Sequence, residues 1–424
     1  MAGHQIIVYS MPGFFMQKYL IIGLLLLIIA LTAIYFVSKK SMVQISKLGG
    51  AAALALDVPE ASSSKKIIPV VPLPIDIEPQ PKMVNPPDEV RGIYLTAWTA
   101  GSSKRVDQLI ALMKEKNLNG VVIDIKDYSG YVSYKMDIPD AVTSGAEKDI
   151  RIIAPNALLK KFHDNGIYVI ARVTVFQDPI FAKAHPELAL QSKASGKTWH
   201  DRKGLAWLDP AGEDSWAYVA AIGNDALHRG FDEINFDYLR FPSDGNLRDI
   251  RYPFWNEKTP QHTIIRNFFA YLDSRVDGAI SADLFGLSTS AADDLGIGQK
   301  IQDSYPYFEF VSPMVYPSHY ATGYLGFKNP ADHPYEVVHF SMESALRRLV
   351  AQGNATSAPS STEPIIPPKA KLRPWRQVFD LGAVYTKSMV QKQIQAVQDT
   401  FASSSGAYGG WLLWDPKNLY TPLK

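Results

Sequence analysis

From residue 90 onward, segments with strand-like patterns of apolar residues alternate with segments in which apolar residues recur at helical spacing. The strand-like segments are rich in branched and aromatic residues, and most are apolar enough to be buried on both faces. We predict strands at 92–98, 120–127, 167–176, 233–241, 279–285, 310–316, 372–380 and 409–414. The helical spacing predicts helices at 106–116, 156–165, 213–229, 263–276, 336–352 and 389–401.

This alternation predicts a parallel sheet with helices packed against it. Eight strand–helix repeats in about 330 residues indicate an α/β fold of the TIM type, a (β/α)₈ barrel. A doubly wound open sheet is the alternative, but no G-x-G-x-x-G turn or P-loop follows a predicted strand. Long segments at 128–155, 177–212 and 317–334 follow strands, so they would lie at the C-terminal face of a barrel.

The N-terminal part has a different pattern. The segment Tyr19–Val37 is a charge-free apolar run of 19 residues, long enough to cross a bilayer as a helix. We therefore expect a short tail at 1–18 and a transmembrane helix at 19–37. A cleaved signal peptide is the alternative, but the small residues at 51–53 lie well beyond the run.

The orientation of this helix has evidence on both sides. Lys39 and Lys40 follow the helix, and the positive-inside rule alone would leave the C-terminal body in the cytoplasm. Large C-terminal domains are nevertheless often exported despite weak flanking charge. We expect a single-pass protein of the cell membrane whose barrel lies on the extracytoplasmic side.

Between this helix and the barrel, residues 38–87 form a proline-rich linker. Its prolines favour an extended, semi-rigid spacer that would hold a globular body away from the membrane. The barrel is then expected at 88–424. A Ser/Pro-rich segment at 354–370 precedes the seventh strand and is expected to be a flexible insert.

Composition narrows the classes of function. The 424 residues carry a net charge of +1, which gives no broad basic surface for nucleic acid. The chain has no cysteine, which excludes disulfides, thiol catalysis and cysteine metal sites. His, Asp and Glu show no metal-ligand spacing, so we expect neither a metal nor another cofactor. A barrel of this size is expected to be monomeric by default.

The segment 231–242, FDEINFDYLRFP, is the most informative stretch of the body. Its alternation places Asn235 and Asp237 on one face of a strand, and Pro242 should end that strand near Arg240. A carboxylate at the edge of an apolar core is costly unless it is paired, hydrogen-bonded or functional. Asp237 is therefore either a functional acid or half of a structural ion pair with Arg240.

Other polar and aromatic residues fall at the ends of the predicted strands, and these ends converge on one mouth in a barrel. Carboxylates, arginines and tryptophans at one rim are typical of a sugar-binding cleft. The alternatives are that the tryptophans fill the core and that the acids bond only loop backbone. The expected substrate-binding residues are Asp124, Lys126, Arg172, Arg240, Tyr316, Trp98, Trp375 and Trp414.

Two carboxylates are the minimum for glycoside hydrolysis, because one protonates the leaving oxygen and the other attacks or activates water. We assign Asp237 as nucleophile or base and Asp283, on the neighbouring strand, as general acid. Adjacent strands suit the separation of roughly 5–5.5 Å that retaining enzymes use. Asp124 is the alternative for either role, and Arg172 and Arg240 would help to keep Asp237 ionised.

Together these stretches carry a family resemblance. RGIYLTAW, GVVIDIKDYSGYVSY, GFDEINFDYLRFPSDG, SADLFG and GGWLLWDP resemble a bacterial family regarded as glycoside hydrolases, itself distantly similar to the α-amylase superfamily. The resemblance covers residues 88–424 and implies an exported, membrane-anchored (β/α)₈ barrel. It implies that the fourth-strand acid, Asp237, is the nucleophile. The acid/base of the α-amylase superfamily is a fifth-strand Glu, whereas this chain has Asp283.

The hypothesis from the sequence is a membrane-anchored glycoside hydrolase that cleaves glycosidic bonds in an extracellular or cell-wall polysaccharide. It would act with retention through two carboxylates. The alternative is a barrel without turnover, either a carbohydrate-binding module or an envelope scaffold. The shorter side chain of Asp283 motivates that alternative, because its carboxyl group would lie about one bond further from a substrate than the carboxyl group of a Glu.

Overall fold

The computed structural model describes residues 76–355 and 366–424. The predicted tail, the predicted transmembrane helix and most of the linker lie outside the described residues, as does the centre of the predicted insert. Within the part that is described, no helix is both long and apolar enough to cross a membrane. The described residues all belong to one compact unit, Val71–Lys424.

The main sheet of this unit is parallel and closes on itself. Its strands follow the order β10-β11-β1-β2-β3-β5-β7-β8-β9, and β10 also pairs with β8 through Trp375 and Met314. The strands are β1 (Val90–Leu95), β2 (Gly120–Lys126), β3 (Tyr168–Thr174), β5 (Glu233–Asp237), β7 (Ala279–Phe285), β8 (Phe310–Met314), β9 (Lys371–Leu372), β10 (Trp375–Gln377) and β11 (Gly410–Trp414).

Two of these strands share one position. β9 pairs with β8, and β10 pairs with both β8 and β11, so β9 and β10 are two pieces of the seventh strand. The described chain therefore forms a closed parallel barrel with eight strand positions, which confirms the predicted (β/α)₈ fold. A small antiparallel pair, β4 (Gln191–Ser192) and β6 (Ile250–Arg251), lies in the loops after β3 and β5.

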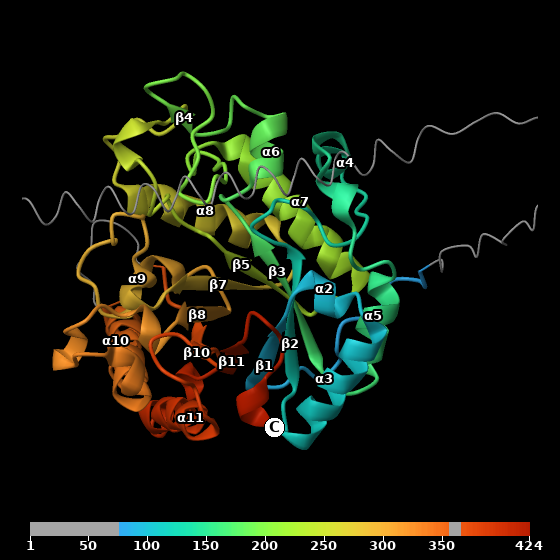
Figure 1. The fold of residues 1–424 in the computed structure, drawn as a ribbon, viewed down its shortest axis with the longest axis vertical. Coiled ribbons are helices and arrows are strands. Elements are labelled where there is room, and N and C mark those ends of the chain that lie inside the picture. The colour runs from blue at the N-terminus through green and yellow to red at the C-terminus, as the bar shows by residue number, and fades with distance from the viewer. Residues whose placement is uncertain (1–75, 356–365) are drawn as a thin grey trace, which may run out of the picture. The chain divides into compact units, whose positions relative to one another are not determined.

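Helices occupy the connections between the strands and lie outside the barrel (Figure 1). The longer ones carry the predicted amphipathic pattern, and their apolar faces pack on the outward-facing residues of the strands. The helices are α2 (Ala97–Ala100), α3 (Ser103–Glu115), α4 (Pro139–Ser144), α5 (Pro155–His163), α6 (Pro179–Ala184), α7 (Glu213–Arg229), α8 (Gln261–Arg275), α9 (Ile301–Ser304), α10 (Pro334–Ala355) and α11 (Lys387–Phe401).

Several strands end one to four residues earlier than predicted, and three departures from the predicted strands have a clear local reason. β1 stops at Leu95 because the hydroxyl of Thr96 accepts a bond from the Thr99 N–H and caps α2. β5 stops at Asp237 because Tyr238 adopts a left-handed φ of 57°. The seventh strand is interrupted at Pro374, which has no N–H to donate to a ladder.

Part of the segment assigned to the linker lies against the barrel. The Asp76 carboxylate accepts bonds from the backbone N–H groups of Asn156 and Ala157 at the start of α5, at 2.9 and 3.1 Å. The Met83 N–H donates to Asp232, 2.7 Å away. These contacts fix residues 76–83 on the body and begin the ordered unit before residue 88.

Inside the barrel, the inward face of β5 is polar along its whole length while its outward residues Ile234 and Phe236 are apolar. At the N-terminal end of this face, Glu233 forms a bidentate ion pair with Arg373, and both side chains are fully buried. Tyr168 donates a further bond to Glu233. A buried cluster of mostly apolar residues fills the barrel interior: Val90, Tyr94, Val122, Tyr168, Ile170, Tyr316, Trp375 and Leu412.

We predict that Arg373→Met lowers the free energy of unfolding by roughly 3–5 kcal/mol, because it leaves the buried Glu233 carboxylate without its partner. The double variant Glu233→Met/Arg373→Met should recover most of this loss, since the isolated charge is gone. Urea unfolding of residues 71–424 measures both. A single variant as stable as wild type, or a double variant no better than the single, would contradict the prediction.

Candidate active site

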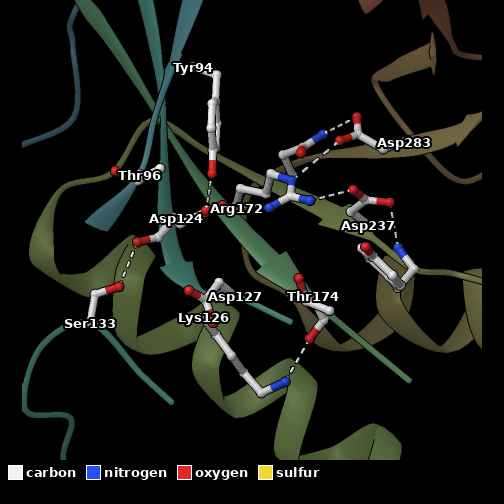
Figure 2. A network of polar contacts seen from close by, with 12 residues as sticks. Tyr94, Thr96, Asp124, Lys126, Asp127, Ser133, Arg172, Thr174, Asp237 and Asp283 are labelled. Carbon is white, nitrogen blue, oxygen red and sulfur yellow. Dashed lines mark hydrogen bonds and ion pairs between the residues drawn. The ribbon is translucent and has the colours of Figure 1, made fainter. Parts of the chain in front are cut away.

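Arg172 lies at the C-terminal end of β3 and joins the acids of three other strands (Figure 2). Its Nη1 is 2.5 Å from Asp124 on β2, and its Nη2 is 2.5 Å from Asp237 on β5. Its Nε lies 3.8 Å from Asp283 on β7. The structure therefore brings these four predicted residues together, and a planar guanidinium sets the geometry of the acids around it.

Asp124 is held on the side of Arg172 that faces β1. Tyr94 donates its hydroxyl proton to the second oxygen of Asp124, so both carboxylate oxygens have partners. The Tyr94 ring in turn stacks on Trp414, with centroids 3.8 Å apart. Asp124 is thus a buried residue that positions Arg172, rather than an acid open to the pocket described below.

Asp283 has a different environment. One of its oxygens, Oδ1, accepts bonds from Asn235 Nδ2 at 2.8 Å and Trp375 Nε1 at 2.7 Å. Its Oδ2 faces Arg172 Nε at 3.8 Å, beyond hydrogen-bond range. Because both donors point at Oδ1, a proton on this carboxyl group belongs on Oδ2.

Asp237 ends β5 with both oxygens bonded in the carboxylate form. Oδ2 accepts from Arg172, and Oδ1 accepts from the N–H of Tyr238 at 2.6 Å. The left-handed turn at Tyr238 directs this N–H back toward the carboxylate. Both oxygens of Asp237 therefore accept bonds from N–H donors.

Burial and charge separate the protonation states of this cluster. Burial and the neighbouring Asp237 raise the pKa of Asp283 to about 8. Burial also raises the pKa of Asp124, despite the opposing effect of Arg172. Burial alone would lower the pKa of Arg172, but Asp124 and Asp237 hold it well above its ordinary value. At neutral pH the site therefore contains a permanent cation and a protonated Asp283.

A pocket of about 780 Å³ opens beside this cluster. Its polar side is formed by Arg172, Asp237 and Asp283, with Arg240 and the aromatic rings of Tyr316 and Trp414 nearby. Of the predicted site residues, these six line the pocket. Both proposed acids therefore reach the same space from adjacent strands.

Four predicted substrate contacts are corrected by the structure. Asp124 and Trp375 are buried behind Arg172 and Asp283 and act on them instead of lining the pocket. Lys126 points away from Arg172, as Figure 2 shows. Its Nζ donates to Thr174 O at 2.7 Å and forms an ion pair with Asp178 at 2.9 Å. A register shift between residues 124 and 126 of β2 changes the direction of this side chain.

Trp98 is the fourth correction, since it lies on α2 rather than at the end of a strand. Its side chain is 67% exposed, and the Arg151 guanidinium covers its ring at 3.6 Å from the centroid. The alternative of a structural ion pair between Asp237 and Arg240 is also not found. Arg240 lies over the rings of Trp207 and Phe285, at 4.8 and 4.9 Å, while Arg172 binds Asp237.

Sequence reasoning missed Tyr94, Asn235 and Tyr238 as parts of the site. The signal for Tyr94 is its position on the inward face of the first strand, two residues before Thr96. Asn235 shares the inward face of β5 with Asp237, which the alternation had already indicated. Nothing in the pattern of residues reveals the left-handed turn at Tyr238.

This arrangement suits acid–base chemistry at a single bond. A neutral Asp283 can donate a proton, and an ionised Asp237 can attack an electrophilic carbon or activate water. Arg172 balances the negative charge of Asp237 without supplying a proton itself. Within residues 76–355 and 366–424, no group of His, Asp and Glu is placed to hold a metal ion.

Comparison with known proteins agrees with this chemistry. The model of a family described as "Putative glycosyl hydrolase domain" matches residues 92–420. No curated protein matches. A hypothetical protein from Ruminiclostridium thermocellum is 40% identical over 45% of this chain and 96% of its own, with a TM-score of 0.42.

Two solved glycoside hydrolases are similar at lower identity. The PgaB (BpsB) glycoside hydrolase domain from Bordetella bronchiseptica is 12% identical over 79% of this chain and 99% of its own, with a TM-score of 0.52. The α-galactosidase TtGalA from Thermus thermophilus is 13% identical over 80% of this chain and 60% of its own, with a TM-score of 0.44. At such identities, the first of these supports the barrel fold alone.

The family model spans most of the chain, and the barrel places two acids in one pocket where a glycosidic bond could lie. The resemblance seen in the sequence is therefore confirmed: this chain belongs to the glycosyl hydrolase domain family and carries a glycoside hydrolase barrel.

Proposed function

We propose that this protein is a membrane-tethered retaining glycosidase that cleaves an extracellular or cell-wall polysaccharide. The arrangement that carries the catalytic part is the unequal pair of acids in one pocket: Asp237 accepts bonds from two donors, and burial and Asp237 raise the pKa of Asp283 to about 8. The tether rests on the apolar sequence of residues 19–37. The extracytoplasmic location rests on the frequent export of large C-terminal domains, although Lys39 and Lys40 oppose it under the positive-inside rule.

In the proposed mechanism, Asp283 protonates the leaving oxygen as Asp237 attacks the anomeric carbon and forms a glycosyl–enzyme intermediate. The ionised Asp283 then removes a proton from water, which displaces Asp237 and restores both groups. Arg172 orients the nucleophile through its ion pair with Asp237, while Asp124 and Tyr94 fix the position of Arg172. The Asn235 and Trp375 bonds hold Asp283 in place.

A non-catalytic barrel that binds glycan is the second candidate. Asp283 stands where the α-amylase superfamily has Glu, and the shorter side chain reaches less far into the pocket. Saturable glycan binding by wild type with no product release would favour this candidate over hydrolysis.

We expect Asp237→Asn to reduce sugar release by roughly 10³-fold or more, because it removes the nucleophile. The measurement is a product assay on residues 71–424 with a panel of polysaccharides and peptidoglycan. Asp127→Asn is the matched control, since Asp127 also follows a barrel strand but bonds Ser129 and lies outside the pocket lining. Hydrolysis that survives in Asp237→Asn would refute the assignment.

The general-acid role of Asp283 predicts a pH limit. The acid must be protonated to act, and its pKa is raised to about 8, so kcat/KM should be retained at neutral pH and fall as pH rises through about 8. Asp283→Asn should abolish this alkaline limb. The same variant should reduce the rate of hydrolysis of alkyl glycosides far more than that of dinitrophenyl glycosides, because the dinitrophenolate leaving group needs no protonation. Equal losses on both would argue against the role.

Retention makes a separate prediction about stereochemistry. Two displacements at the anomeric carbon restore its configuration, so the first product should have the configuration of the substrate. Proton NMR during the first minutes of hydrolysis measures this before mutarotation. A first product with inverted anomeric configuration would show that Asp237 is the base that activates water and not the nucleophile.

A further inference from the structure

The pocket beside the acids has two chemically different sides. Arg172, Asp237 and Asp283 form the polar side. A second wall comes from the ends of β7 and β8 and the loops that follow them, and its side chains are aliphatic or aromatic. This wall consists of Phe285, Leu287, Leu295, Ile297, Met314 and Tyr320. The Arg240 guanidinium, 4.9 Å from the Phe285 ring centroid, also lines the pocket, and its Nη1 bonds Phe241 O and Ser243.

Such a wall is a poor surface for a sugar ring rich in hydroxyl groups. Leucine, isoleucine and methionine side chains offer no strong hydrogen-bond partner, and a hydroxyl buried against them loses its bonds to water. The hydroxyl of Tyr320 is already bonded to Ser341 at 2.9 Å, outside the pocket lining. The wall therefore favours a group without hydroxyls.

The wall is fixed in place beside Asp283. Gln299 accepts a bond from the Phe285 N–H at 2.9 Å and donates to Leu239 O at 3.2 Å, which ties the 295–299 loop to the ends of β7 and β5. The Phe241 N–H donates to Ile297 O at 2.9 Å. Because Phe285 is two residues beyond Asp283, the apolar wall begins next to the acid.

Leu295 adopts an uncommon backbone conformation within this wall. Its φ is 59°, a left-handed value that is costly for a bulky residue. Asp293 and Asp294 accept bonds from the N–H groups of Leu295 and Gly296, each at 3.1 Å, and hold the turn. Asparagine or glycine would suit this backbone better, yet the residue here is a leucine that lines the pocket.

We propose that this pocket binds a glycoside that carries an alkyl, acyl or aryl group beside the reacting sugar, with Leu295 packed against that group. This inference rests on the proposed function, which places the reacting sugar between Asp237 and Asp283. The apolar group then occupies the wall formed by the 285–297 and 314–320 segments. Two chemical sources fit this wall: an apolar aglycone on the anomeric oxygen and an acyl group on the sugar itself.

Two matched ligand pairs separate these sources. The first is methyl and butyl β-D-glucopyranoside, and the second is N-acetyl- and N-butanoyl-D-glucosamine. Binding to the full chain in lipid nanodiscs is measured by calorimetry, with empty nanodiscs subtracted. Each buried methylene should raise affinity roughly threefold to fourfold, so butyl should exceed methyl by about tenfold or more if the group is an aglycone. A gain confined to N-butanoyl would assign an acylated sugar.

Leu295→Asn tests the wall directly, because asparagine tolerates the left-handed backbone while removing the apolar surface. The gain in affinity for the longer ligand should fall to about twofold or less. Leu325→Asn is the matched control, since Leu325 also has a left-handed φ, 53°, and lies outside the pocket lining. It should retain the wild-type gain. Leu287→Ser, at a wall residue that is 41% exposed, is a second variant with little effect on folding.

Equal affinities within both ligand pairs for wild type, or an unchanged gain in both wall variants, would overturn the inference. This outcome is separate from the test of hydrolysis. If sugar release depends on Asp237 but the two ligands of each pair bind with equal affinity, the apolar site is refuted and the glycosidase is supported. If the longer ligand binds more tightly but no hydrolysis occurs, the apolar site is supported and the glycosidase is refuted.

Discussion

The buried guanidinium of Arg172 is the interaction on which the site depends. Two carboxylates from different strands lie 2.5 Å from it, and a third lies 3.8 Å away. Carboxylates so close together repel one another in a buried place, and an unpaired one would be costly. A single cation compensates part of this charge, and the proton retained by Asp283 reduces the remainder. The chemical difference between Asp237 and Asp283 therefore arises because three carboxyl groups surround a single arginine.

At the N-terminal end of the same barrel, buried charges are compensated in a different way. Glu233 and Arg373 are matched one to one in a bidentate pair, with Tyr168 as an additional donor. This pair is suited to stability, in keeping with the N-terminal face of such barrels, whereas the C-terminal cluster retains a protonated acid facing a pocket. β5 contributes to both ends through Glu233 and Asp237, and Asn235 between them bonds Asp283. One short strand therefore connects the structural and the chemical parts of the interior.

The surroundings of the acids explain how the site is kept rigid. Tyr94, stacked on Trp414, supports Asp124, and Trp375 supports Asp283. These aromatic residues fill the barrel and also donate hydrogen bonds, so loss of packing there would also move the acids. The pocket itself changes from polar to apolar within two residues of Asp283 along β7. That change places selectivity for the substrate directly beside the reacting bond.

The sequence by itself determined the barrel, because strands buried on both faces and amphipathic helices leave a local periodic pattern. It also determined the convergence of Asp124, Arg172, Asp237 and Asp283, since parallel strands must bring their C-terminal ends to one mouth. Only the tertiary structure decided which of these residues touch the pocket. A register shift in β2 turns the Lys126 side chain away from the pocket, and Trp98 lies on the capped helix α2 outside the pocket. Asp237 pairs with Arg172 instead of Arg240. Such outcomes depend on contacts between residues distant in sequence and on single backbone angles, as at Tyr238, which periodicity does not encode.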